Sequence, residues 1–285
     1  LNYDPVRYPF FGVRSTISGV GFNIAKALTV LGDSVSLISL VGEDLPGKLS
    51  RLALEQAGIS TSGILSRLEH TAQSVILYDA SGRRQIHVDL KDIQEQSFPE
   101  EAFHQALQGK DLAILCNINY SRPFLPQVRQ AGILLASDVH AVASLEDEYN
   151  RDFMAAADIL FLSHERLPVE PEEFARQVLE RYGAGIVVIG LGGQGAILAV
   201  RDEKSPRRFP AVATRPVVNS IGAGDALFSS FLHFFLKTGD PAESIHHAQV
   251  FASYKIGATG AADGFITEDE LALLPAFYFG PDSIP

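Results

Sequence analysis

The sequence predicts an α/β fold with a mainly parallel central sheet, helices on both faces and a small accessory β-sheet lid. Short, β-branched apolar stretches alternate with helical patterns, which is the order expected of strand–helix–strand units. Proline opens several of the helical patterns, where its missing N–H costs nothing. A stretch of partly alternating polarity at 74–89 interrupts this series and predicts the accessory sheet.

The strands and helices follow one another along the chain. Buried strands are predicted at five short apolar runs: 35–41, 112–118, 132–137, 158–162 and 185–189. Helices that begin at a proline are predicted at 46–56, 123–130 and 171–182, and a strongly apolar helix at 226–237. Strands joined in this way form a parallel sheet that is buried on both faces.

Two hairpins complete the prediction. The first spans 74–89 around a turn at 80–83, and the second joins 195–200 to 208–214 through a charged loop. We expect a single domain over 1–285, with a small lid formed by about 5–18 and 74–90. A sheet of this kind usually opens with a strand, so the start at Leu1-Asn2-Tyr3-Asp4 indicates an incomplete first strand.

Composition excludes several classes of function. A net charge of −11 without a Lys/Arg cluster disfavours a nucleic-acid partner. No apolar run approaches the roughly 18 residues of a membrane span, so no membrane partner and a cytoplasmic location are expected. The single cysteine, Cys116, excludes an internal disulfide and lies in an apolar run, which favours an inert core thiol over a nucleophile.

The run Gly222-Ala223-Gly224-Asp225 precedes the apolar helix. Free N–H groups at a helix start form an anion site, and glycines let backbone approach a phosphate closely. Asp225 would stand beside such a phosphate, where a carboxylate can take a proton from an attacking hydroxyl. A plain glycine turn, with Asp225 as a favourable charge at the helix start, explains the same residues equally well.

A second glycine segment, Ser18-Gly19-Val20-Gly21-Phe22-Asn23, also precedes a helical pattern. Asn23 can both donate to and accept from a sugar hydroxyl. Alone, this segment is more simply a helix-start turn. A dinucleotide fingerprint is disfavoured, because Ile24 stands where its third glycine or alanine should be.

At 219–225 the sequence resembles the PfkB family of carbohydrate kinases, the ribokinase-like group, whose signature ends in Gly-Ala-Gly-Asp. Asn219 and Ser220 replace the Asp and Thr that usually open this signature. The resemblance implies a ribokinase-like fold, Asp225 as general base and the backbone of Gly222, Ala223 and Gly224 as anion hole. It also implies ATP and Mg²⁺ as cofactors, with transfer of the γ-phosphoryl group to a hydroxyl of a sugar, sugar derivative or nucleoside.

Further segments resemble the family. Gly19 and Asn23 match its first signature and Asp4 its first strand, which implies that these three residues bind substrate. Gly192 and Gly195 match a turn beside the nucleotide, although a plain hairpin turn explains the same glycines. Ser220 is expected to contact the nucleotide as well. Asp44 lies in a turn that resembles the family, but a helix N-cap is the preferred interpretation of this residue.

Several residues depart from the family pattern. Ser163 and Arg166 replace the Asn and Glu of its Asn-x-x-Glu element, so only Glu165 offers a carboxylate to a metal there. Asn219 replaces a carboxylate that some relatives use for a monovalent cation, so potassium activation is not expected. These changes, with Gly190 in place of a usual Thr, keep a second hypothesis open: a catalytically weakened, kinase-like ligand-binding or regulatory protein. A homodimer is a candidate assembly, since relatives often dimerise through their lids.

Overall fold

The computed structural model describes residues 6, 8–78 and 84–274. Its main sheet has six strands in the order β10-β9-β8-β7-β6-β5. Four neighbouring strands are parallel: β5 (Leu112–Ile114), β6 (Leu134–Ala141), β7 (Ile159–Ser163) and β8 (Ile186–Gly190). Two antiparallel strands extend the sheet: β9 (Ala196–Val200) and β10 (Arg207–Phe209). The mainly parallel central sheet is therefore confirmed, and the second predicted hairpin corresponds to β9 and β10.

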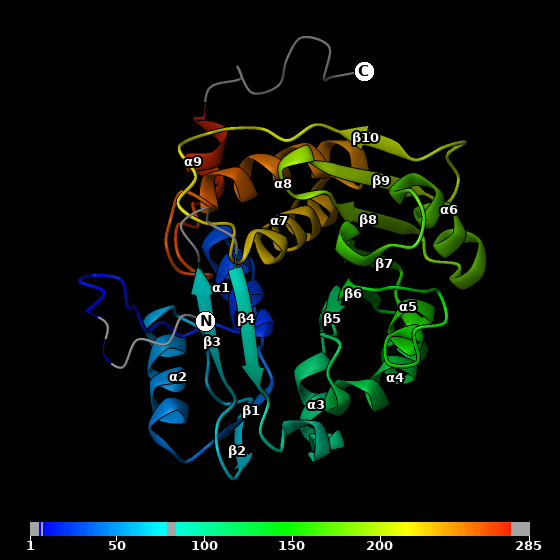
Figure 1. Cartoon of the computed structure of the whole chain (residues 1–285). Coiled ribbons are helices and arrows are strands. Elements are labelled where there is room, and N and C mark those ends of the chain that lie inside the picture. Colours follow the sequence, from blue (N-terminus) through cyan, green and yellow to red (C-terminus); the bar gives the residue numbers. More distant parts are fainter. Residues whose placement is uncertain (1–5, 7, 79–83, 275–285) are drawn as a thin grey trace.

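Helices cover both faces of this sheet (Figure 1). Alternate strand residues such as Leu160 and Phe161 belong to opposite apolar clusters, as the two-residue period of a strand requires. One cluster contains residues of α3 (Glu100–Leu107), α4 (Leu125–Gln130), α5 (Arg151–Ala156) and α6 (Pro171–Tyr182). The other contains residues of α1 (Val20–Leu31), α7 (Ala223–Thr238) and α8 (Pro241–Lys255). The short α9 (Glu268–Ala272) follows and begins with a capping box at Thr267.

Local sequence explains where the helices begin and end. Asp44 is the N-cap of α2 (Leu45–Gln56), and its side chain accepts a hydrogen bond from the Gly47 amide, which confirms the predicted cap. Pro171 starts α6 and Pro241 starts α8, as expected of the first helical turn. α7 ends at Thr238, and its C-cap Gly239 adopts the left-handed conformation that glycine tolerates best.

One strand lies elsewhere than predicted. The run 35–41 was expected in the main sheet, but it yields β1 (Ser39–Gly42), which pairs in parallel with β2 (Ile64–Leu68) in a separate two-stranded sheet. Within the part of the chain that the structure describes, β1 makes no ladder to β5, so the prediction of one continuous sheet is wrong at this point. Apolar periodicity shows that a strand is buried, but does not name its partner.

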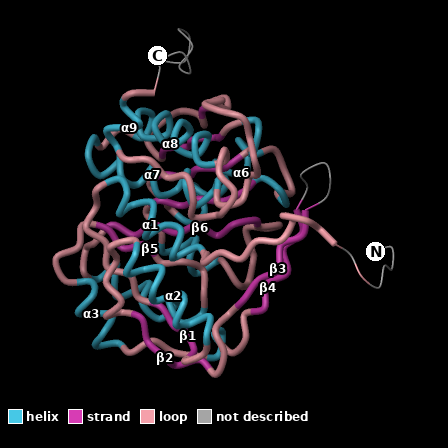
Figure 2. Tube along the Cα trace, turned by 90° about the vertical axis from the view of Figure 1, so that its left-hand side faces the viewer, coloured by secondary structure: helices cyan, strands magenta, loops and turns pink. Residues whose placement is uncertain are grey.

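The small antiparallel sheet is present. β3 (Gln73–Tyr78) and β4 (Arg84–Asp89) form a ribbon that lies along one side of the molecule, as Figure 2 shows. The other predicted lid segment, 5–18, contains no strand among its described residues 6 and 8–18. Within the described residues, no helix combines the length and the apolar character needed to cross a bilayer.

Candidate active site

A large open pocket lies at the carboxyl ends of the parallel strands, where open α/β sheets usually bind ligands. Residues at or just beyond the carboxyl ends of four neighbouring strands line it: Asn117 after β5, His140 near the end of β6, Glu165 after β7 and Gly192 after β8. The beginnings of α1 and α7 close the same pocket. The fold therefore brings both glycine segments of the sequence to one site.

The start of α7 is open to a ligand. Its N-cap, Gly222, has φ 72° and provides no side-chain cap. A Cβ at Gly222 would clash with the Ala261 carbonyl, whereas a Cβ at Gly224 would meet nothing within 4 Å. Amides of a first helical turn, next to unfilled space, form a cradle that suits a phosphate group. The Ala223 amide already donates to the Ser220 carbonyl at 3.2 Å, so Gly222 and Gly224 are the candidates for this cradle. The anion-hole role of these residues stays a prediction, which the open space beside Gly224 supports.

The loop before α7 is fixed by the chain that follows α8. Val218 donates its amide to the Ile256 carbonyl at 2.9 Å. The side chain of Asn219 donates to the Thr259 carbonyl at 2.8 Å and accepts from the Ile221 amide at 3.1 Å. Asn219 therefore holds this loop in place through two hydrogen bonds. A side-chain amide suits this role because it can donate and accept at the same time.

Asp225 and Asn23 meet in the pocket although 202 positions separate them. The Asn23 amide nitrogen donates to Asp225 Oδ2 at 2.6 Å, and the Ser18 hydroxyl donates to Asn23 Oδ1 at 3.3 Å. Asn23 is only 3% exposed, and Gly19, with φ 126°, is the N-cap of its helix. Packing of α1 against α7 brings the two side chains together.

The pKa of Asp225 is raised from 3.8 to about 6, mainly by burial of its carboxylate. The hydrogen bond from Asn23 opposes this shift, the charge of Asp138 adds to it, and His140 and Lys255 lower the pKa. A carboxylate that titrates near pH 6 is ionised at neutral pH and is a stronger base than an ordinary aspartate.

Asp138 and His140 also line the pocket, and the sequence interpretation missed both. The His140 amide donates to Asp138 Oδ1 at 2.8 Å, and His140 has φ 58°, a conformation rare for a residue with a side chain. Burial raises the pKa of Asp138. The available signal was a carboxylate and a histidine at the end of an otherwise apolar strand, within 137–140.

Cys116 lines the pocket too. Burial, with the nearby negative charges of Asp225 and Asp138, raises its thiol pKa to about 12. The thiol is therefore protonated at neutral pH, in agreement with the prediction of an inert cysteine.

The predicted nucleotide residues lie on the same pocket. Gly192 begins a short 3₁₀ turn between β8 and β9 and Gly195 follows that turn, while Ser220 lies in the loop before α7. Gly195, with φ 98°, leaves no room for a Cβ against the Phe209 carbonyl, so its glycine is also required by the hairpin itself. Asp4 lies outside the described residues.

The metal prediction rests on one side chain. Glu165 is exposed and lines the pocket, and the neighbouring His164 ring is 2.9 Å from the Gly190 carbonyl. No group of three or more His, Cys, Asp or Glu side chains suited to a metal occurs in the described part of the chain. Mg²⁺ needs no such group, because it typically binds one or two carboxylates together with substrate phosphates and water. Glu165 offers one such carboxylate to the pocket.

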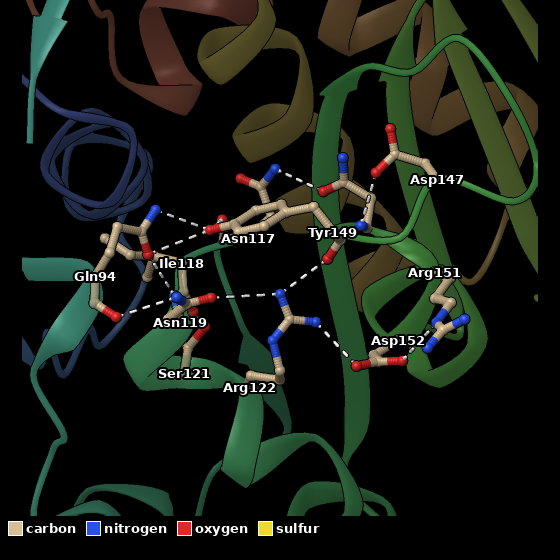
Figure 3. A network of polar contacts seen from close by, with 11 residues as sticks. Gln94, Asn117, Ile118, Asn119, Ser121, Arg122, Asp147, Tyr149, Arg151 and Asp152 are labelled. Atoms are coloured by element: carbon tan, nitrogen blue, oxygen red, sulfur yellow. Dashed lines mark hydrogen bonds and ion pairs between the residues drawn. The ribbon is translucent and has the colours of Figure 1, made fainter.

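The polar network drawn in Figure 3 includes residues that line another part of the pocket. The Tyr149 hydroxyl donates to the Asn117 carbonyl at 2.9 Å, and Gln94 donates to that hydroxyl at 2.9 Å. Asn117 donates to Asn150 Oδ1 at 2.9 Å, and Arg122 donates to the Tyr149 carbonyl at 2.8 Å. Gln94, Asn117 and Tyr149 all line the pocket, so this wall offers groups that can bind hydroxyls.

Comparison with known proteins identifies the family. The family model described as "pfkB family carbohydrate kinase" matches residues 9–268. The chain belongs to the pfkB family of carbohydrate kinases. It is therefore a carbohydrate kinase by family, and the resemblance inferred from 219–225 is confirmed.

Two curated relatives align with most of this pfkB kinase. It is 28% identical over 270 residues to acarbose 7(IV)-phosphotransferase of an Actinoplanes species, covering 94% of this chain and 88% of the relative. It is 27% identical over 254 residues to the ATP-dependent ribose-1-phosphate kinase of Halopiger xanaduensis, covering 87% and 83% of the two chains.

Solved structures confirm the ribokinase-like fold. A microbiome-derived acarbose kinase superposes with a TM-score of 0.80 at 26% identity, covering 88% of this chain and 84% of that one. Ribokinase from Thermotoga maritima gives a TM-score of 0.74 at 19% identity, covering 90% and 86%. The second likeness supports the fold alone.

Proposed function

We propose that this pfkB kinase transfers the γ-phosphoryl group of ATP to a hydroxyl of a sugar, sugar derivative or nucleoside. The observation that carries the proposal is the hydrogen bond between Asn23 and Asp225 at the open start of α7. It places a carboxylate, a polar group suited to an acceptor hydroxyl and an anion cradle at one point.

Each group has a separate task in the proposed reaction. Asp225 accepts the proton of the acceptor hydroxyl while that oxygen attacks the γ-phosphorus, and the bond from the γ-phosphorus to the bridging oxygen of ATP breaks to release ADP. Asn23 orients the Asp225 carboxylate and supplies a hydrogen-bonding group to the substrate. The backbone at Gly222, Ala223 and Gly224 stabilises negative charge on the transferring group, with the Gly222 and Gly224 amides as donors because the Ala223 amide already donates to the Ser220 carbonyl. A donor in known anion holes contributes about 10²–10³ in rate.

ATP and Mg²⁺ are the proposed cofactors. The turn at Gly192 and Gly195, with Ser220, would lie along the nucleotide, and Glu165 would hold Mg²⁺ through water or directly. When bound, the ion neutralises charge on the phosphates. The use of ATP by the Halopiger relative supports this choice of phosphoryl donor.

A polyhydroxylated acceptor is the proposed substrate class. The wall formed by Gln94, Asn117 and Tyr149 presents amide and hydroxyl groups whose positions are fixed by mutual hydrogen bonds. Named activities of relatives include an acarbose phosphotransferase, a ribose-1-phosphate kinase and a pseudouridine kinase, which supports sugars and nucleosides as the range to be tested.

The test is an ADP-release screen over pentoses, hexoses, sugar phosphates, oligosaccharides and nucleosides, with and without Mg²⁺. We expect at least one acceptor to release ADP in a Mg²⁺-dependent manner. If the protein binds ATP but no acceptor releases ADP, the alternative of a kinase-like binding or regulatory protein replaces the proposal. The residues that motivate this alternative are Ser163, Arg166, Gly190 and Asn219.

Assembly and location stay predictions. The β3–β4 ribbon exposes Val75, Leu77 and Val88, and such apolar exposure is compatible with a homodimer through the lid. Light scattering of the purified protein measures the assembly: a monomeric mass at micromolar concentration would contradict the dimer. A cytoplasmic location agrees with the expected use of ATP.

A further inference from the structure

Lys255 is buried to 0% exposure at the last residue of α8. Its ammonium group donates to the carbonyl oxygen of Ile221, the residue just before the N-cap of α7. Transfer of an ammonium from water into a protein interior is costly unless oxygen atoms compensate it. Lys255 therefore holds a positive charge next to the proposed anion hole at the start of α7.

Lys255 contacts the loop before α7 and does not face the space in which the acceptor would bind. It does not line the pocket, whereas Ile221 and Gly222 do. The residues that follow Lys255 also hold this loop. The carbonyls of Ile256 and Thr259 accept hydrogen bonds from Val218 and Asn219. The negative end of the α8 dipole also favours a cation at this helix terminus. Lys255 therefore supports the anion-hole backbone from behind.

We propose that Lys255 is a positioning residue for phosphoryl transfer: a built-in cation that holds the Ile221 carbonyl and thereby aims the Gly222–Gly224 amides at the transferring group. This inference rests on the proposed kinase function and adds a residue to its machinery. Because the charge is covalently attached, the loop needs no dissolved monovalent cation. Its field also reaches Asp225, the proposed base.

The test compares steady-state kinetics of wild type, Lys255→Met, Lys255→Ala and the exposed control Lys48→Met on the acceptor found in the screen. We expect kcat of both Lys255 variants to fall by about 10- to 100-fold with a smaller change in KM for the acceptor. Wild type and Lys48→Met should respond equally little to added K⁺ or NH₄⁺. In Lys255→Ala, these cations should restore kcat in a saturable manner, because they can occupy the vacated site.

A second readout is the acid limb of kcat/KM. Asp138, His140 and Lys255 are the charged neighbours of Asp225, and only Lys255 is removed, so the apparent pKa of this limb should rise in Lys255→Met. Unchanged kcat in folded Lys255→Met, or a loss in Lys255→Ala that neither cation restores, overturns the inference. If Lys255→Ala does not fold, kcat and the acid limb of Lys255→Met decide. Absence of turnover in wild type is a failure of the proposed function instead.

Discussion

At the scale of single residues, the pair Asn23 and Asp225 explains how an aspartate becomes a useful base. Burial raises the carboxylate pKa, and the amide of Asn23 lowers it, so that the two effects leave the pKa near 6. The proposed base is thus ionised at neutral pH without being as weak as an exposed aspartate.

This balance predicts the effect of Asn23→Ala. Without the donated hydrogen bond, the ionised form of Asp225 is less favoured, so the acid limb of kcat/KM should move from about pH 6 to higher pH. A pH–rate profile measures the shift. Thr29→Ala, on the same helix, serves as control and should leave the limb in place. A limb that stays near pH 6 in Asn23→Ala would contradict the assigned role of the amide.

Part of this site could be predicted from sequence. The Gly-Ala-Gly-Asp run and Asn23 each suggested a ligand site, and their order along the chain made the family resemblance specific. Asp138 and His140 escaped notice because a polar residue at the end of a strand is common, and only the folded chain shows that they approach Asp225. In the sequence, Asn219 is only a departure from the family pattern. Its hydrogen bonds to Thr259 and Ile221 in the folded chain explain why an amide stands there.

At the scale of elements, the start of α7 separates two kinds of glycine. Gly222 is required by its positive φ and by the nearby Ala261 carbonyl, whereas Gly224 lies in an open helical turn. Gly222 is therefore required by the conformation of the loop. Gly224 is required only if a ligand such as phosphate comes close to the helix start.

Alanine at each position should separate these roles. Gly222→Ala should lower both the melting temperature and kcat, because the loop must shift. Gly224→Ala should keep or slightly raise the melting temperature, since alanine favours a helix, yet should reduce kcat/KM for ATP by crowding the cradle. Thermal melts and kinetics of both variants test this. Wild-type kinetics in Gly224→Ala would show that phosphate does not approach this turn.

Element boundaries were predicted best where local signals were strong. The helix at 171–182 agrees with α6, because a proline starts it and a glycine follows its end. Of the buried strand predicted at 35–41, only 39–41 belong to a strand, β1, and it pairs with β2 in a small separate sheet, because pairing depends on chain segments outside the strand itself.

At the scale of the whole molecule, a sheet with helices on both faces holds the site together. One apolar cluster packs α1 and α7 against the sheet and so fixes them relative to the strand ends that form the pocket. The alternation of strands and helices made this architecture predictable, while the acceptor depends on individual side chains of the pocket wall.

The fold should remain stable when the proposed base, Asp225, is replaced. The pKa of Asp225 lies above its ordinary value, so the carboxylate favours folding when protonated below about pH 4, and this contribution is lost as pH rises through 6. Asparagine at this position does not ionise, so Asp225→Asn avoids the destabilisation that a buried carboxylate causes at neutral pH. We therefore expect a free energy of unfolding at pH 7 equal to wild type or higher by up to roughly 3 kcal/mol.

Transfer of labelled γ-phosphate from ATP to the acceptor, compared in wild type and Asp225→Asn, tests the central claim most directly. We predict that both proteins bind ATP with similar affinity, that wild type labels the acceptor, and that Asp225→Asn labels it about 10²–10⁴ times more slowly. Equal rates of labelling in the two folded proteins would contradict Asp225 as the base of this kinase.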